Sequence, residues 1–429
     1  MTTSYTCTSQ QPETCKLSEQ KLANKPLFIE DIQFEDENLR KAILENAVEY
    51  NYEKVSDANY LHLGDKGIKT AKEIAYFTNL EYLQISKNEL TCLDLSKNIN
   101  LKELSVSNNQ LTNLDLSNLI NLIKLEANFN QLTQVNISQN IALKSIDLQS
   151  NTLEELDVSK NTELESLTLF RNNKLTLLNV TKNEKLTWLS IGFNKIKEIN
   201  LKNNRLLKGF RARENQLYKI DFSNCTLLKS IDVRDNKLKT INVTKLIKLE
   251  ALKISNNQIS EIDITNNTRL TYLAIDKNKI KTLNVDSHPY LEEISANDNQ
   301  LMCLSTLNNK NLESLDLDDN QLKNIDLSNN LILTNLSLDR NNITNLDLSE
   351  NNKLRYIVIR ENGLTHIKLT DSMSLHLLGL EGNKLTKLII PTGTVIDKLW
   401  ITENPLNEQT LESLNLIRKK NPNWVILIE

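Results

Sequence analysis

Apolar and polar positions follow each other along most of the chain in a pattern that returns every 21 residues. Counting from Leu83, an apolar residue occupies the same place in sixteen successive units, and Asn173 lengthens one unit to 22 residues. An asparagine follows each apolar anchor five positions later, from Asn88 to Asn404. Such a period indicates a solenoid of stacked units, because one unit cannot bury its apolar face alone. The anchors are Leu83, Leu104, Leu125, Ile146, Leu167, Leu189, Phe210, Ile231, Leu252, Leu273, Ile294, Leu315, Leu336, Ile357, Leu378 and Leu399.

The unit reads L-x-x-L-x-L-x-x-N-x-L-x-x-L-D-L-S-x-N-x-x, which is the leucine-rich-repeat pattern in a short form. The L-x-L piece predicts a short strand, and strands of successive units are expected to pair in parallel at about 4.8 Å. The asparagine is expected to satisfy backbone groups in the following turn and to form a ladder. Because 21 residues leave no room for a convex helix, the pattern predicts extended or turn-like convex segments and a gently curved rod. Its strand ladder would be roughly 75–80 Å long.

The chain outside the clear repeats predicts a tail and two caps. Residues 1–26 are polar and without period, which predicts a disordered tail. Residues 27–60 predict a helical cap, and the solenoid is expected to span residues 61–404, with a divergent first repeat at Leu61. Residues 405–429 predict a C-terminal cap. One cap helix is expected to begin after Asp36, with Leu39, Ile43, Ala47 and Tyr50 on its apolar face. The other is expected to begin after Asn407, with Leu411, Leu414 and Ile417, and residues 424–428 predict a closing strand or an apolar lid.

The repeat, the half-motif Leu93-Asp94-Leu95-Ser96 and the opening segment from Phe34 to Ile43 resemble bacterial internalin-like leucine-rich-repeat proteins. The segments at Gly67-Ile68 and from Thr78 to Leu83 resemble them too. The resemblance covers about residues 30–405 and implies a rod that binds partner proteins, often host proteins, and is secreted or surface-attached. One branch of the family carries a cysteine ladder, whereas here Ile85, Val106, Ala127 and Leu148 occupy the equivalent column. No signal peptide or wall anchor is seen in the sequence, so a cytoplasmic or non-classically secreted protein stays an alternative.

Composition narrows the class of function. Asparagine makes up 60 of the 429 residues, and the formal net charge is -4. This charge argues against a nucleic-acid binder driven by phosphate contacts, and no apolar run approaches the length of a membrane span. The four histidines (His62, His288, His366 and His376) are scattered over distant units. We therefore expect no enzyme, no metal site and no cofactor, and a monomer without membrane insertion.

Two surfaces of the predicted concave face are candidates for binding. The first combines aromatic and arginine side chains, the types enriched at interface hot spots, and is the predicted partner-binding patch. The second is an acidic stretch that either meets a basic partner or is a solvated charged face. The patch comprises Phe129, Phe170, Arg171, Trp188, Phe193, Arg211, Arg213 and Arg234. The acidic stretch comprises Asp276, Asp298, Asp316, Asp318, Asp319 and Asp339.

The remaining polar columns and the cysteines favour structural roles. A column of Asp or Asn on the convex side predicts turns in which side chains bond nearby backbone. Cys92 and Cys303 occupy the same column ten units apart, so they cannot pair with each other. Cys7 and Cys15 are candidates for a bond within the tail, and Cys225, in place of a convex asparagine, is expected to be buried. The turn column comprises Asp94, Asp115, Asn136, Asp157, Asn179, Asn200, Asp221, Asn242, Asp263, Asn284, Asp326 and Asp347.

Together these features predict a non-catalytic leucine-rich-repeat scaffold that binds another protein through its concave face, and the family resemblance implies a host protein as the partner. Two alternatives stay open. One is an intracellular effector or regulator of the same fold, and the other is a glycan-binding surface protein that uses Trp188 and nearby aromatic residues.

Overall fold

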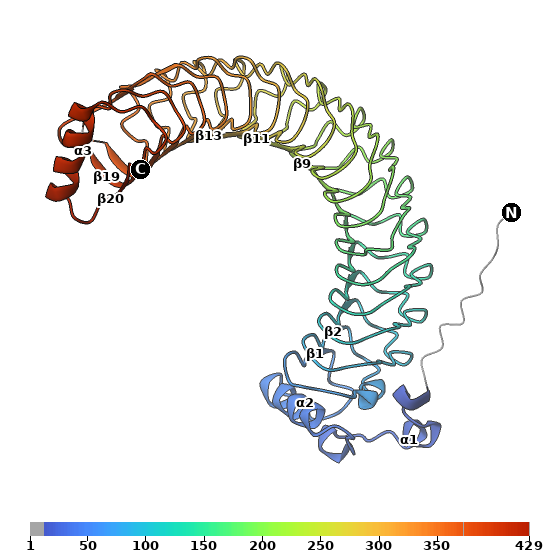
Figure 1. The fold of residues 1–429 in the computed structure, drawn as a ribbon. Helices are drawn as coiled ribbons and strands as arrows, with labels where there is room; N and C mark the ends of the chain where they lie inside the picture. The colour runs from blue at the N-terminus through green and yellow to red at the C-terminus, as the bar shows by residue number, and fades with distance from the viewer. Residues whose placement is uncertain (1–12, 372, 429) are drawn as a thin grey trace. The chain divides into compact units, whose positions relative to one another are not determined.

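The apolar anchors of the 21-residue period lie at the centres of short parallel strands. This computed structural model describes residues 13–371 and 373–428 (Figure 1). The chain divides into two compact units, Met1–Leu217 and Tyr218–Glu429. Each unit is a stack of repeats in which one strand per repeat faces one side and irregular segments face the other. The leucine-rich-repeat solenoid predicted from the sequence is confirmed.

The first unit contains eight of these strands, paired in the register that the period predicts. Leu61 pairs with Leu83, Leu83 with Leu104, and this continues to Leu189 and Phe210. The divergent first repeat at Leu61 therefore joins the ladder as expected. The strands are β1 (Tyr60–His62), β2 (Tyr82–Gln84), β3 (Glu103–Ser105), β4 (Lys124–Glu126), β5 (Ser145–Asp147), β6 (Ser166–Thr168), β7 (Trp188–Ser190) and β8 (Gly209–Arg211).

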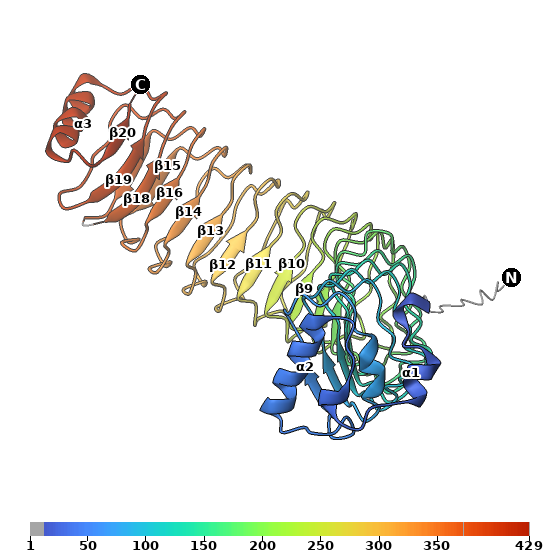
Figure 2. The ribbon, with the colours of Figure 1, turned by 90° about the horizontal axis from the view of Figure 1, so that it is seen from below.

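The second unit continues the same arrangement, and its strands lie side by side in Figure 2. The closing strand predicted near the C-terminus is present as β20, which pairs in parallel with β19. Two convex segments, β15 and β17, form a separate parallel pair, so the backbone there is extended rather than helical. The strands are β9 (Ser230–Asp232), β10 (Ala251–Lys253), β11 (Tyr272–Ala274), β12 (Glu293–Ser295), β13 (Ser314–Asp316), β14 (Asn335–Ser337), β15 (Asn345–Leu348), β16 (Tyr356–Val358), β17 (His366–Leu369), β18 (Ser374–Gly379), β19 (Val395–Trp400) and β20 (Val425–Leu427).

The asparagine five residues after each anchor supports the turn that follows the strand. At Asn109, Oδ1 accepts the backbone N–H of Leu90 at 3.0 Å, in the preceding repeat. Its Nδ2 donates to the carbonyls of Ile85 and Val106 at 3.0 and 3.1 Å. One side chain thus satisfies backbone groups of two repeats that would otherwise be buried without partners. The predicted asparagine ladder is present.

A second asparagine ladder lies inside the convex side. Asn161 is fully buried, and its Nδ2 donates to the carbonyls of Ile137 and Asn140 at 3.1 and 2.9 Å. Cys225 takes an asparagine position in this column and is fully buried, as the sequence predicts, while His288 places Nε2 2.9 Å from the carbonyl of Ile264. The sequence analysis did not predict this second ladder, although the column is visible in the repeat pattern. Its asparagines are Asn98, Asn140, Asn161, Asn183, Asn204, Asn267, Asn309, Asn330 and Asn351.

The predicted convex turns are confirmed in all twelve positions of the Asp/Asn column. In each, the side-chain oxygen accepts the backbone N–H two residues later, as in Asp94 with Ser96 at 3.0 Å. These side chains therefore hold the backbone of the convex turns.

Short helices close the two ends. Asp36 caps α2 (Glu37–Glu49) by accepting the N–H groups of Asn38 and Leu39 at 2.8 and 3.1 Å. Within this helix Leu39 and Ile43 are buried as predicted, but Tyr50 lies beyond the helix as its exposed C-cap, and Ala42 and Asn46 complete the buried face. Asn407 caps α3 (Glu408–Lys420) through the N–H of Thr410 at 2.9 Å. The described residues also form three 3-10 turns, Glu13–Cys15, Ile29–Asp31 and Lys72–Tyr76.

The N-terminal segment corrects the prediction of a disordered tail. Residues 1–12, including Cys7, lie outside the described part of the chain, but α1 (Glu19–Ala23) is ordered and Cys15 and Leu17 are buried. Cys15 forms a disulfide with Cys92, with the two Cα atoms 5.9 Å apart. The expected bond between Cys15 and Cys7 within the tail was therefore wrong, because Cys92 is the partner of Cys15. The spacing of the cysteines in the sequence did not indicate this bond. Cys15 and Cys92 are 77 residues apart, and they meet only because the N-terminal segment folds back onto the first repeats.

Candidate functional site

Four columns of side chains cover the outward-facing side of the strands, which we call the strand face. Counted from the anchor, they are positions −1, +1, +3 and +4. Every residue at +4 has a left-handed backbone, and the fifteen that are not glycine have φ between 49° and 59°. None of them is Val, Ile or Thr, because branching at Cβ disfavours this conformation. Phe129, Arg171 and Phe193 all occupy position +4, which fixes the direction in which they leave the strand.

Six of the eight predicted patch residues meet in the repeats of β6, β7 and β8. We call Phe170, Arg171, Trp188, Phe193, Arg211 and Arg213 the aromatic–arginine cluster. The Phe170 and Phe193 ring centroids are 4.9 Å apart with an interplanar angle of 66°. The Cζ atoms of Arg171 and Arg213 lie 5.2 and 5.0 Å from the Phe193 centroid, and that of Arg211 lies 4.7 Å from the Trp188 centroid. Cation–π attraction therefore holds the three guanidinium groups over the rings.

Two glycines make room for the rings of this cluster. A Cβ atom at Gly209 would lie 2.3 Å from the Trp188 ring, and one at Gly192 would lie 3.0 Å from the Phe170 ring. Any other residue at Gly209 would displace the tryptophan. The chain has only eight glycines, and two of them lie beneath these rings. The rings therefore rest on the strand ladder instead of projecting freely into water.

The arginines of the cluster differ from other arginines of the strand face in their partners. Arg234, in the second unit, pairs with Asp232 at 2.8 Å, Arg340 with Asp319 at 2.5 Å and Arg360 with Asp339 at 2.6 Å. Arg171, Arg211 and Arg213 make no ion pair with any described residue. Phe129, 46% exposed, makes no ring contact with the cluster among the described residues.

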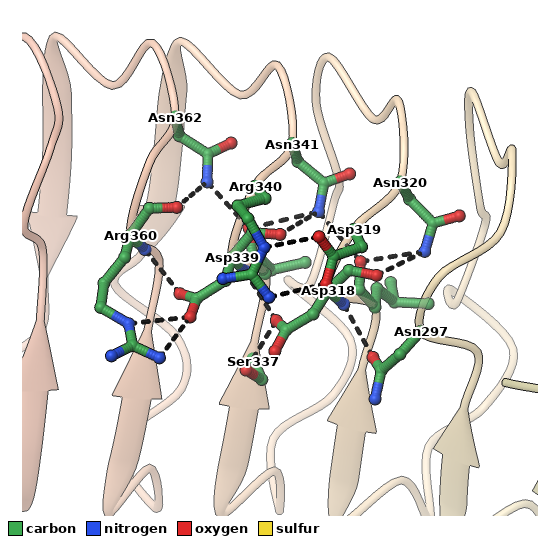
Figure 3. Close-up of polar contacts among 12 residues, drawn as sticks. Asn297, Asp318, Asp319, Asn320, Ser337, Asp339, Arg340, Asn341, Arg360 and Asn362 are labelled. Atoms are coloured by element: carbon green, nitrogen blue, oxygen red, sulfur yellow. Dashed lines mark hydrogen bonds and ion pairs between the residues drawn. The ribbon is translucent and has the colours of Figure 1, made fainter. Parts of the chain in front are cut away.

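Three residues of the acidic stretch form a hydrogen-bonded ladder with Asn297 at position +3 of the strand face. Figure 3 shows its part from Asn297 to Arg360. Asp276, Asn297, Asp318 and Asp339 occupy this position in four successive repeats. A side-chain oxygen of each accepts the backbone N–H of the +3 residue one repeat later, and the four distances, ending at Arg360, are 3.0, 2.8, 2.7 and 2.7 Å. The carboxylates thus satisfy strand-face N–H groups that the short strands leave unpaired.

Most other oxygens of the acidic stretch are also engaged. Ser337 donates to Asp318 at 2.7 Å, and the Arg360 guanidinium donates to Asp339 at 2.8 Å. The pKa of Asp319 is lowered, chiefly by its hydrogen bonds from Arg340. Asp298 is exposed. Within the described residues no group of three or more His, Cys, Asp or Glu side chains could hold a metal ion. Several of these carboxylates therefore hold neighbouring repeats together, a role that neither interpretation in the sequence analysis included.

Asp316 is the exception in this stretch. It lies at position +1 and accepts a hydrogen bond from Asn297 at 2.6 Å through Oδ2, but Oδ1 is buried without a partner. Burial raises the pKa of Asp316 to about 6, opposed by the Asn297 amide and assisted by the charges of Asp318 and Asp276. The ionised form is therefore disfavoured in the folded protein.

We expect Asp316→Asn to stabilise the protein at pH 7.5. Since the folded-state pKa of about 6 lies above the ordinary 3.8, the folded chain binds the extra proton, and the wild type loses stability as pH rises between these values. The shift corresponds to at most about 3 kcal/mol, and partial exposure reduces the expected gain to about 1–2 kcal/mol. Urea unfolding at pH 4.5 and 7.5 measures it, with exposed Asp298→Asn as control. A gain as large at pH 4.5 as at pH 7.5 would contradict the assignment.

The sequence analysis missed an aromatic row at the start of the strand face. Tyr60 and Tyr82 stand at position −1 of β1 and β2, and their rings stack with centroids 4.2 Å apart and an interplanar angle of 6°. Tyr50, after α2, lies edge-on to Tyr60 at 5.2 Å. The tyrosines at −1 in two successive repeats were the available signal. The contribution of Tyr50 depends on how the cap packs, which the repeat pattern does not encode.

Known structures with the same architecture include two internalins and a plant receptor. No protein-family model matches the chain, and no curated protein sequence matches it. The functional domain of InlJ from Listeria monocytogenes, described as including a cysteine ladder, is 28% identical, with 82% of each chain covered and a TM-score of 0.75. InlF from Listeria monocytogenes is 26% identical over 78% of this chain and 98% of its own, with a TM-score of 0.64.

The plant structure is the leucine-rich-repeat ectodomain of the membrane receptor kinase GASSHO1/SCHENGEN3 from Arabidopsis thaliana, in complex with CASPARIAN STRIP INTEGRITY FACTOR 2. It is 21% identical over 78% of this chain and 52% of its own, with a TM-score of 0.64, and shows the shared fold alone. No helix within the described residues is long and apolar enough to cross a bilayer. The column that would carry a cysteine ladder is apolar here, with Ile85, Val106 and Ala127 buried. With its repeat length and register, the chain is a leucine-rich-repeat protein whose solenoid resembles those of InlJ and InlF.

Proposed function

We propose that this protein is a non-catalytic scaffold that binds another protein through its strand face, with the aromatic–arginine cluster as the contact surface. The observation that carries the proposal is the cluster itself, in which three partly exposed aromatic rings and three guanidinium groups gather over three repeats. Only 5% of the chain is aromatic, so this concentration is unusual for the sequence. Trp, Tyr and Arg are the residues most enriched at interface hot spots.

The scaffold suits binding because the surface is formed before the partner arrives. Strand pairing and the asparagine ladder fix the backbone beneath the cluster, for example through Asn194, whose Nδ2 donates to the carbonyls of Leu169 and Ile191 at 2.9 Å. Ring stacking and cation–π contacts restrict the side chains as well. A surface ordered in this way loses little conformational entropy on binding, so more of the contact energy appears as affinity.

The structural neighbours and the disulfide suggest where such binding takes place. Two neighbours are internalins of Listeria monocytogenes, and a third is a receptor ectodomain in complex with its factor. The Cys15–Cys92 disulfide favours an oxidising environment. We therefore favour a bacterial protein that acts outside the cytoplasm on a host protein over an intracellular effector of the same fold.

The glycan-binding alternative has weaker support. A sugar would need an open aromatic face, and the Trp188 ring rests against Gly209 with the Arg211 guanidinium over it. This arrangement offers charged N–H donors to a partner more readily than an apolar platform. A glycan array probed with the wild type separates the two proposals, because binding that is lost in Trp188→Ala would favour the glycan.

The test is affinity capture with paired baits. The double variant Phe170→Asp/Trp188→Asp places charges inside the cluster and is expected to reduce capture of the partner at least about tenfold, as removal of hot-spot residues does. Prey comes from lysate of the source cell and from host-cell surface extract. The matched control, Ile120→Asp/Leu177→Asp, changes two exposed apolar residues outside the cluster (57% and 68% exposed) and should capture normally. Equal capture by both double variants, with intact circular dichroism, would refute the cluster as the interface.

A further inference from the structure

The guanidinium groups of the aromatic–arginine cluster keep their hydrogen-bonding capacity. Arg171, Arg211 and Arg213 have no carboxylate partner among the described residues, whereas Arg340 and Arg360 donate to Asp319 and Asp339. Each guanidinium carries five N–H donors and stays protonated at any physiological pH. Three positive charges that form no ion pair with a described residue therefore lie on one local surface of a chain whose formal net charge is -4.

Stacking directs these donors toward a partner. Guanidinium groups commonly lie flat on aromatic faces, which leaves the N–H groups at their edges free for in-plane hydrogen bonds. Arg213 lies 5.3 and 5.0 Å from the centroids of Phe170 and Phe193, and Arg171 lies 5.8 and 5.2 Å from the same two. The rings thus hold both arginines in place before binding. A carboxylate is the planar acceptor that fits such a group with two parallel hydrogen bonds.

The spacing of the arginines matches an extended acidic segment. Arg211 and Arg213 are two residues apart on the same extended stretch, so their Cα atoms are separated by roughly 6.5–7 Å. Side chains on one face of an extended peptide repeat at that same distance. We infer that the partner presents an extended segment with Asp or Glu at alternate positions, whose carboxylates pair with Arg211, Arg213 and Arg171. This inference rests on the proposed function.

A long polyanion fits the surface less well. Beyond the cluster, the strand face carries Asp147 on one side and Glu214 beside Arg213, and these charges would repel a highly charged polymer such as a sulfated glycan or a nucleic acid. A short acidic segment needs only the local positive charge. The apolar part of such a segment would contact the partly exposed rings of Phe170 and Phe193.

The test uses random dodecapeptides displayed on phage and selected on the intact wild-type chain at low salt. Selected sequences are expected to contain Asp and Glu at least about threefold more often than the input library. Synthetic versions with Gln in place of Glu should bind about tenfold more weakly, because a neutral amide accepts weaker hydrogen bonds from a guanidinium group than a carboxylate does. Selection of sequences without acidic enrichment, or of none, would overturn the inference.

Paired variants locate the effect. Arg211→Gln/Arg213→Gln should weaken binding of the selected acidic peptides about tenfold or more, while Arg205→Gln/Arg269→Gln removes the same charge outside the strand face and should leave it unchanged. Equal loss in both variants would mean that net charge alone is responsible and would reject the site. If partner capture depends on Phe170 and Trp188 but not on Arg211 and Arg213, this inference fails while the proposed function stands. If heparin binds to the protein and the acidic peptides do not, the inference of a carboxylate-bearing partner is also rejected.

Discussion

Replacing Asn172 by alanine is expected to lower the free energy of unfolding by about 3–5 kcal/mol. Asn172 is fully buried in the ladder beneath the aromatic–arginine cluster. Its Oδ1 accepts the N–H of Leu153 at 3.1 Å, and its Nδ2 donates to the carbonyls of Leu148 and Leu169 at 3.0 and 3.1 Å. Alanine would leave three buried backbone groups without partners, and each such group costs about 1–3 kcal/mol.

The chain supplies a matched control one residue away. Asn173, the extra residue of the 22-residue repeat, is exposed, so Asn173→Ala makes the same chemical change without burial and should alter stability by less than about 0.5 kcal/mol. Chemical unfolding followed by circular dichroism compares the two variants. Hydrogen exchange should also show faster opening in the repeats adjoining Asn172, because each repeat is stabilised by its neighbours. Similar stability of both variants would mean that the ladder is not a main source of stability.

Breaking the Cys15–Cys92 disulfide is expected to have the second large effect. The bond joins residues 77 apart in sequence, for which the chain-entropy relation gives about 4.5 kcal/mol and experience with other disulfides suggests about 2–4 kcal/mol. Cys92→Ser should therefore lower the melting temperature and free the segment around Cys15, which is buried in the wild type. Limited proteolysis before α2 would report that release.

Cys303→Ser is the control for this change. Cys303 stands in the same column of the repeat as Cys92 but is exposed and forms no disulfide, so its replacement should be nearly neutral. Reductant should lower the melting temperature of the wild type and of Cys303→Ser alike, and leave Cys92→Ser unchanged. A wild type that is insensitive to reductant would show that the disulfide contributes little to stability.

The repeats could be predicted closely from sequence, and the N-terminal segment could not. The period fixes which residues pair, so the register of Leu83 with Leu104 follows from counting alone. Asp36 and Asn407 were identifiable as helix caps because capping depends on a few neighbouring residues. The pairing of Cys15 with Cys92 depends on how a non-repetitive segment folds back, and no local rule describes that.

The same distinction applies to the candidate site. Counting along the 21-residue period placed Phe170, Trp188 and Phe193 in neighbouring repeats and therefore predicted that they lie near one another. It did not reveal that Gly192 and Gly209 lie under the rings, because that requires the direction of each side chain. The acidic stretch was also visible in the sequence. Its hydrogen-bonded ladder was not, because it depends on which backbone N–H groups lack a partner in the folded chain.

The left-handed backbone at position +4 has a consequence for how this surface can diverge. At positions −1, +1 and +3 the backbone is not left-handed, so it places no such restriction on branching at Cβ. At +4, where Arg171 and Phe193 stand, a single-step change to Val, Ile or Thr would carry a conformational penalty of about 1 kcal/mol or more. Substitutions in that column are therefore expected to favour side chains that are not branched at Cβ, such as Lys, Arg, Asn, Asp and Phe. The turn geometry thus biases the chemistry of the surface toward long or polar side chains before any selection by a partner.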